Sequence, residues 1–107
     1  MSDKAMRVWK SYHTPSMPNY ARRPKNAVFI SPANSLKHEQ AKLKVCYELR
    51  QASSDFITEA VDNKTGHRRD VVDLATGLIY EIETDPKRAK RFECQKGIMV
   101  IKCWREK

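Results

Sequence analysis

Closely spaced turn signals divide two thirds of this chain into short segments, and they constrain its fold more than any other feature. Turn-forming residues lie in the segments 62–66, 75–77 and 85–86, with Gly77 in the second of these, and at Gly97. Such clusters mark turns and element boundaries. The intervening runs are short and rich in β-branched and aromatic residues, which is typical of strands. We therefore predict strands over residues 55–61, 67–74, 78–84 and 98–103.

Two helices complete the predicted domain. Asn34 or Ser35 can cap a helix that runs to about Gln51. Asp85, followed by Pro86, is typical of a cap and a first helical residue, and predicts a short helix over residues 86–93. Helical spacing places five residues on one predicted face of the longer helix: Leu36, Glu39, Leu43, Cys46 and Tyr47. The predicted order from residue 34 is α-β-β-β-α-β, an α/β fold.

The N-terminal segment differs in composition from the rest of the 107 residues. Residues 1–34 hold six basic residues, one acidic residue and four of the five prolines. Because proline restricts itself and the residue before it, we predict a basic, extended arm over residues 1–33, preceding a domain over residues 34–107. The apolar run 27–30 is expected to dock on that domain. Trp9, Tyr12 and Tyr20 either stack on bases or pack on the domain, and the sequence leaves both readings open.

Charge and cysteine content bound the function. The net charge of +8 favours a polyanionic partner, with nucleic acid first. The three cysteines form no Cys-x-x-Cys pair, which argues against a disulfide scaffold and a zinc ribbon. No apolar stretch approaches the length of a spanning helix, and the first residues lack the apolar core of a secretion signal. We expect a cytoplasmic protein, or one encoded by a virus or mobile element that acts in the host cytoplasm, without membrane association.

Carboxylates are concentrated on the second and third predicted strands. A hairpin that opposes Val72 to Glu81 and Asp70 to Glu83 places Asp70, Glu81 and Glu83 on one face. Three close carboxylates repel one another and raise one another's pKa. A divalent cation removes that penalty, and Mg²⁺ is commonly held by one or two carboxylates with substrate phosphates and water. The pattern therefore suggests a metal site, although an exposed polar hairpin face is the plainer alternative.

Other polar residues are expected near these carboxylates. Glu59 on the first strand can point toward the same site. The longer helix adds His38, Glu39 and Lys42, of which His38 and Lys42 lie one helical turn apart. Two of these residues also have simpler interpretations: Glu39 as a partner of Lys42, and His38 as a surface or packing residue.

At this point the residues resemble a known family. The element order, Asp70 on the second strand and Glu81-x-Glu83 on the third are similar to the PD-(D/E)xK nuclease superfamily. That superfamily includes archaeal Holliday junction resolvases, restriction enzymes and competence-protein-type nucleases. The resemblance covers about residues 35–103. It implies a restriction-endonuclease-like fold with a mixed central sheet, in which Asp70 and Glu81 bind Mg²⁺ or Mn²⁺.

The resemblance also suggests roles for the other residues. His38 and Lys42 match a His-x-x-x-Lys helix pattern of some members, Glu39 matches a helix glutamate of others, and Glu59 matches a first-strand glutamate. The third-strand lysine of the family is replaced by Glu83, so Glu83 or Lys42 would orient the attacking water.

The resemblance and the charge predict a metal-dependent nuclease that hydrolyses DNA phosphodiester bonds, with branched or structured DNA as a candidate substrate. We expect a homodimer, because so small a domain covers little duplex alone, and no small-molecule cofactor. The alternatives are a non-catalytic nucleic-acid-binding protein that retains the fold and a structural or accessory protein. Eight basic residues are predicted to contact nucleic acid, although those of residues 86–93 can also be a solvated helix face: Arg22, Arg23, Arg68, Arg69, Lys87, Arg88, Lys90 and Arg91.

Overall fold

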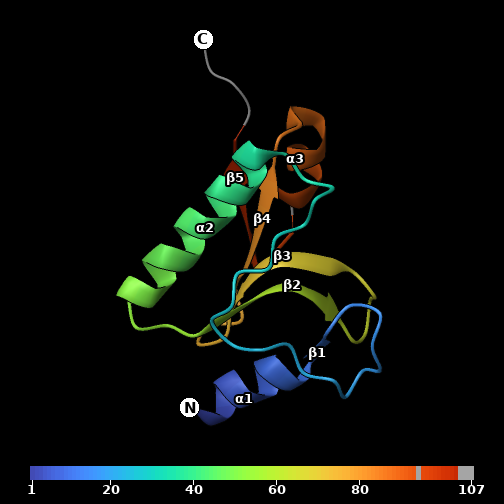
Figure 1. The fold of residues 1–107 in the computed structure, drawn as a ribbon, viewed down its shortest axis with the longest axis vertical. Helices are drawn as coiled ribbons and strands as arrows, with labels where there is room; N and C mark the ends of the chain where they lie inside the picture. Colours follow the sequence, from blue (N-terminus) through green and yellow to red (C-terminus); the bar gives the residue numbers. More distant parts are fainter. Residues whose placement is uncertain (94, 104–107) are drawn as a thin grey trace.

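The described part of the chain forms one five-stranded mixed sheet with three helices (Figure 1). The computed structural model describes residues 1–93 and 95–103. The elements in chain order are α1 (Asp3–Lys10), β1 (Tyr12–His13), α2 (Leu36–Gln51), β2 (Phe56–Asp62), β3 (Arg68–Asp73), β4 (Ile79–Glu83), α3 (Pro86–Glu93) and β5 (Ile98–Lys102). The α/β class and the predicted element order from residue 34 are both confirmed.

The sheet has the strand order β1-β2-β3-β4-β5. Neighbouring strands are antiparallel from β1 to β4, whereas β4 and β5 are parallel and joined through α3. The predicted local signals are responsible for the boundaries. Ser35 Oγ accepts the His38 N–H at 3.1 Å and caps α2, while Asp85 Oδ1 accepts the Lys87 N–H at 3.0 Å at the start of α3.

Helices α1 and α2 pack on opposite faces of the sheet. Buried side chains of α1 and β1 meet one sheet face in a first core cluster: Ala5, Tyr12, Ile57, Ala60, Val72 and Leu74. Buried side chains of α2 meet the other face in a second cluster: Val45, Cys46, Leu49, Phe56, Val71 and Ile82. In Figure 1, α1 lies below the strands and α2 crosses beside them. Burying apolar side chains on both faces is the main stabilising contribution for a sheet of this size.

The prediction of an extended N-terminal arm is wrong for residues 3–10, which form α1. Ser2 Oγ accepts the Ala5 N–H at 3.0 Å and caps this helix. The first proline is Pro15, so the proline restriction begins only after α1 has ended. The arm is also attached to the sheet, because Tyr12 pairs with Asp62 in the β1–β2 ladder. The division of the chain at residue 33 stays a prediction.

The aromatic residues of this segment differ in their burial. Tyr12 is buried in the first core cluster, and Trp9 packs against that cluster while its Nε1 donates to the Arg23 carbonyl at 2.7 Å. Tyr20 is 81% exposed. The run 27–30 docks as predicted, since the Phe29 N–H donates to Thr58 Oγ1 at 3.0 Å and Val28 packs on the second cluster.

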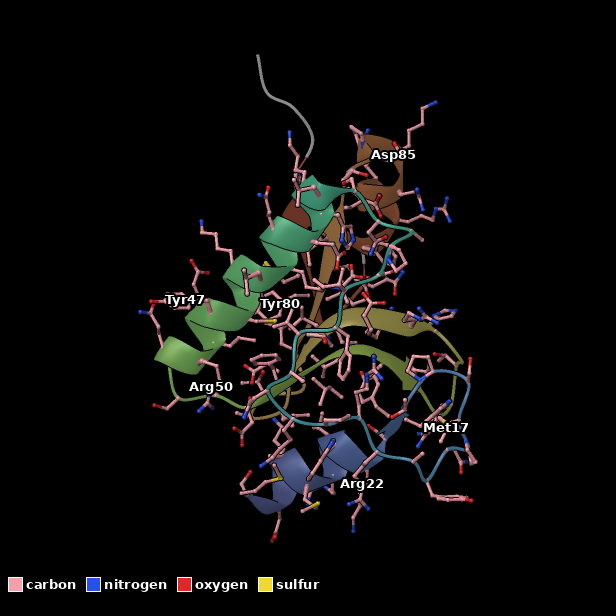
Figure 2. All side chains as sticks on the ribbon, viewed as in Figure 1. Met17, Arg22, Tyr47, Arg50, Tyr80 and Asp85 are labelled. Carbon is pink, nitrogen blue, oxygen red and sulfur yellow. The ribbon has the colours of Figure 1, made fainter. Side chains whose placement is uncertain are left out.

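The predicted buried face of α2 is wrong for its three largest apolar residues. Leu36, Leu43 and Tyr47 are exposed, and Figure 2 shows Tyr47 on the side of α2 turned away from Tyr80 and the strands. The buried face instead holds six residues: His38, Glu39, Lys42, Val45, Cys46 and Leu49. The polar members of this face are buried because each has a hydrogen-bonding partner, which hydropathy alone does not reveal.

The predicted register of the β3–β4 hairpin is also wrong, by two residues. Val72 lies opposite Ile79 rather than Glu81, and Val71 lies opposite Tyr80. The cause is the turn. Asp73 accepts hydrogen bonds from the Ala75 N–H at 3.0 Å and from Thr76 Oγ1 at 3.1 Å, and its N–H donates to the Leu78 carbonyl. The turn therefore closes between Asp73 and Leu78 rather than between Leu74 and Ile79, and Asp70 is not opposite Glu83.

No helix within residues 1–93 and 95–103 is long and apolar enough to cross a membrane.

The packing of the N-terminal segment predicts that Tyr12 stabilises the domain. We expect Tyr12→Ala to lower the free energy of unfolding by about 3 kcal/mol, because an aromatic side chain of the core is removed. Tyr20→Ala is the matched control and should change it by less than about 0.5 kcal/mol, since Tyr20 is exposed. Urea denaturation followed by circular dichroism measures both. Equal effects of the two substitutions would show that the segment is not part of the core.

Candidate functional site

A polar cleft of about 470 Å³ lies where the start of α2, the strands β3 and β4, and α3 come together. It brings together four of the predicted catalytic residues: His38, Asp70, Glu81 and Glu83. Arg88 and Arg91 of α3 also line it. The cleft therefore combines carboxylates with cationic side chains, the two kinds of group that bind and act on phosphate esters.

Asp70 projects from β3 and is held on two sides. Its Oδ2 accepts the Ile82 N–H of β4 at 2.8 Å and lies 3.5 Å from His38 Nε2. Burial raises the pKa of Asp70, while the Ile82 N–H and the charge of His38 act in the opposite direction.

Glu81 projects from β4 and is almost completely buried. Its Oε2 lies 3.4 Å from Arg69 Nη1. Burial and the negative charge of Asp70 raise the pKa of Glu81 to about 8, and Arg69 acts in the opposite direction. Asp70 and Glu81 are thus two coupled carboxylates in one poorly hydrated place, an arrangement in which both are ionised only at a cost.

Glu83 lies at the end of β4 and is bound to the start of α3. Its Oε1 accepts the N–H groups of Thr84 and Asp85, each at 3.2 Å, and lies 3.7 Å from Arg88 Nε. The carboxylate therefore fixes the β4–α3 connection and also positions an arginine at the cleft.

A second group of predicted residues lies behind the cleft rather than on its lining. Lys42 of α2 is completely buried, and its Nζ lies 2.7 Å from Glu39 Oε1 and 2.9 Å from Glu59 Oε2. It also donates to the Phe29 carbonyl at 2.6 Å. An ammonium group has three donors, so these contacts use all of them.

Glu39 connects the buried lysine with the cleft. Its Oε2 lies 2.9 Å from His38 Nδ1, so Lys42, Glu39, His38 and Asp70 form a continuous chain of polar contacts. Burial by itself would raise the pKa of Glu39, but hydrogen bonds from Lys42, Asn34, the Ser31 N–H and His38 outweigh it and lower the pKa to about 2.

Glu59 occupies a strained position within β2. Its φ of +50° lies in the left-handed region, which is unusual for a residue with a Cβ. Ile57 and Ala60 both belong to the first core cluster, although residues three apart on a regular strand point to opposite faces. The strain at Glu59 breaks the alternation, and its carboxylate reaches Lys42 of α2.

The predicted nucleic-acid-binding residues are dispersed. Arg23 is buried, donates to the Thr58 carbonyl at 3.0 Å and lies 3.6 Å from the Phe29 ring centroid, so these contacts lie within the fold. Arg22 lies 5.4 Å from the Trp9 ring centroid on the side of the molecule shown near α1 in Figure 2. Lys87 and Lys90 are exposed on α3 but do not line the cleft. Arg68 and Arg69 lie at the start of β3 and are not among the residues that line the cleft.

Two contributions were missed from the sequence. The Arg69–Glu81 pair joins residues of adjacent strands and depends on the shifted hairpin register. Asn34 was read as a possible cap, whereas its Nδ2 donates to Glu39 Oε2 at 2.9 Å. No local signal distinguishes these roles, because both depend on tertiary contacts.

Within the described part of the chain, no group of three or more His, Cys, Asp or Glu side chains is arranged to hold a metal ion. Asp70 and Glu81 form a pair of carboxylates, which is a smaller donor set. Comparisons of the chain with protein-family models, with curated proteins and with solved structures gave no match.

The depressed pKa of Glu39 predicts a stability that depends on pH. We expect Glu39→Gln to be less stable than the unsubstituted protein by up to about 3 kcal/mol above pH 4.5, the ordinary pKa. The difference should shrink as the pH falls from 4.5 toward 2, because over this range the unfolded chain binds a proton at Glu39 that the folded protein does not. Urea denaturation at a series of pH values measures it. Glu48→Gln, at an exposed position of α2, is the control. A difference independent of pH would contradict the assignment.

Proposed function

We propose that this protein is a metal-dependent nuclease that hydrolyses DNA phosphodiester bonds, with a domain similar to those of the PD-(D/E)xK superfamily. The observation that carries the proposal is the pairing of Asp70 with Glu81 in a cleft that Arg88 and Arg91 also line. Carboxylates alone would repel a phosphate. Two carboxylates beside two arginines suit a phosphate that arrives with a divalent cation.

Asp70 and Glu81 are the residues that would hold Mg²⁺ or Mn²⁺, with the Ile82 carbonyl as a further oxygen. Oxygen ligands from one or two carboxylates are what Mg²⁺ prefers, with water and phosphate oxygens in the remaining positions. The contact of 3.4 Å between Arg69 and Glu81 is long for a charge-assisted hydrogen bond and leaves the carboxylate available. When bound, the ion supplies Lewis acidity that activates water and neutralises charge developing on the phosphoryl group.

The other cleft residues bind, orient and hold protons. Arg88 and Arg91 would bind the non-bridging phosphate oxygens. Glu83, fixed by the Thr84 and Asp85 N–H groups, would orient the attacking water from a defined position. His38 is held through Nδ1 by Glu39 and presents Nε2 toward Asp70, where it can keep a proton near the carboxylate. Lys42 is a positioning residue in this proposal, because its three donors are already engaged.

The topology supports the same proposal. The elements α2, β2, β3, β4, α3 and β5 follow the order α-β-β-β-α-β, with an antiparallel meander followed by a parallel strand reached through α3. Asp70 lies on the second strand of this series and Glu81 on the third, the placement that the resemblance requires. The proposed homodimer remains an argument from the small size of the domain.

A specific observation favours a second candidate, a nucleic-acid-binding protein without catalysis. No lysine is among the cleft-lining residues that the structure describes, and Glu83 occupies the position where the family carries one. A protein of this kind would bind DNA through its arginines and would not need Asp70 or Glu81.

Cleavage assays distinguish the two candidates. We expect the protein to cut labelled DNA with Mg²⁺ or Mn²⁺ and not with EDTA. Asp70→Asn and Glu81→Gln should each lower the rate by about 100-fold or more, because each removes the negative charge of a proposed ligand of the ion. The substrates are single-stranded, duplex, flap and four-way-junction DNA of matched sequence.

Glu48→Gln is the matched control for Glu81→Gln, since Glu48 is exposed on the outer side of α2. Its rate should stay within twofold of the unsubstituted protein. Absence of cutting, together with DNA binding that Asp70→Asn leaves unchanged, would overturn the nuclease proposal in favour of the binding protein.

A further inference from the structure

A second hollow, of about 560 Å³, adjoins the cleft. Glu81, Arg91 and Phe92 line both, so the two share a wall. The second hollow continues over the start of β3, where Arg68 and Arg69 line it, and over Gln95 beyond the end of α3. Its volume lies within the range of about 300–1,000 Å³ that is usual for small-ligand sites.

The lining of this hollow is cationic and aromatic. Arg68 and Arg91 are exposed, while Phe92 is half-buried. Arg69 is 8% exposed, and its Nε finds no hydrogen-bond partner among the described residues. An unsatisfied buried donor is uncommon, because the missing hydrogen bond costs free energy. The guanidinium is thus incompletely satisfied by Glu81 alone, and it belongs to the lining of the hollow.

We propose that this hollow receives one unpaired nucleotide of the substrate strand, next to the phosphate that lies in the cleft. Its base would stack on Phe92, and its phosphate would lie between Arg68 and Arg91. The inference rests on the proposed function for the position of the neighbouring phosphate, and it adds the substrate class: DNA with single-stranded character, such as a flap, a frayed end or a single strand.

The chemistry of the lining favours an unpaired nucleotide over a duplex. Bases within a duplex are stacked on both faces, so an aromatic side chain reaches a base face only where the strand is unpaired. Phosphate contacts by arginine position either form of DNA and do not discriminate between them. Phe92 is therefore the residue on which discrimination should depend, whereas Arg68 should contribute affinity.

Fluorescence anisotropy in EDTA, with the full chain, tests this without cleavage. The probes are a labelled 20-nucleotide single strand and the blunt duplex of the same sequence. We expect Phe92→Leu to weaken binding of the single strand about tenfold, the lower part of the range for a lost base–aromatic stack. Binding of the duplex should change less than twofold. Phe92→Tyr, which keeps the ring, should retain the affinity for the single strand.

Arg68→Gln provides a second variant, because this side chain is 53% exposed and its contact with the Glu59 carboxylate is a long one, at 3.6 Å. It should lower the slope of log affinity against log salt by about 0.7 for the single strand, as expected for one lost phosphate contact. Arg7→Gln is the matched control: Arg7 is exposed on α1 and lines neither the cleft nor the hollow. It should have a smaller effect than Arg68→Gln.

The outcomes separate this inference from the proposed function. Equal effects of Phe92→Leu on both probes, no effect on either, or no DNA binding at all would overturn the nucleotide site. Should Phe92→Leu fail to fold, by circular dichroism, a salt slope unchanged in Arg68→Gln would overturn it. Selective loss of single-strand binding without any metal-dependent cutting would retain the nucleotide site and reject the nuclease. Cutting that needs Asp70 but is unchanged by Phe92→Leu and Arg68→Gln would retain the nuclease and reject the nucleotide site.

Discussion

The buried ammonium group of Lys42 is the constraint on which the rest of the site depends. Removing such a charge from water costs several kcal/mol, so it is tolerated only with close partners of opposite charge and further hydrogen bonds. Lys42 finds Glu39 on its own helix, Glu59 on β2 and the Phe29 carbonyl from the connection before α2. These three contacts fix the rotation of α2 against the sheet. They explain why His38 faces Asp70, while Leu36, Leu43 and Tyr47 face outward.

The same constraint accounts for the strain in β2. A non-glycine residue in the left-handed region costs on the order of 1–3 kcal/mol and persists where its surroundings stabilise it. At Glu59 the stabilising contact is the ion pair with Lys42, supported by Arg68 at 3.6 Å on the other carboxylate oxygen. A regular strand would direct this carboxylate toward the α1 side and leave Lys42 with one acidic partner. Backbone strain and the buried ion pair are therefore two parts of one arrangement.

How far the sequence predicted this arrangement depends on the range of each interaction. The element order was predictable because Asp85-Pro86, Ser35 and the glycines of the turns act locally. The buried face of α2 was not, since hydropathy favours Leu43 and Tyr47 over Lys42 unless the partners of Lys42 are known. The register of β3 against β4 failed for a similar reason, because the Asp73 carboxylate closes the turn through contacts that residue type alone does not specify. Asp70, Glu81, Glu83 and His38 were nevertheless predicted and share the cleft, although the argument that placed them used the wrong register.

The two-residue change in register has a consequence for the chemistry. In the predicted hairpin, Asp70 would lie opposite Glu83; the shift of two residues keeps all three carboxylates on one face but brings Asp70 beside Glu81 instead. In the observed one, Asp70 is joined to the Ile82 N–H and coupled to Glu81, while Glu83 turns to the start of α3 and to Arg88. The acidic groups are thus divided between a coupled pair and a carboxylate that positions an arginine. Arg88 and Arg91 line the same cleft as the acidic pair, so their positive charges offset part of its negative charge.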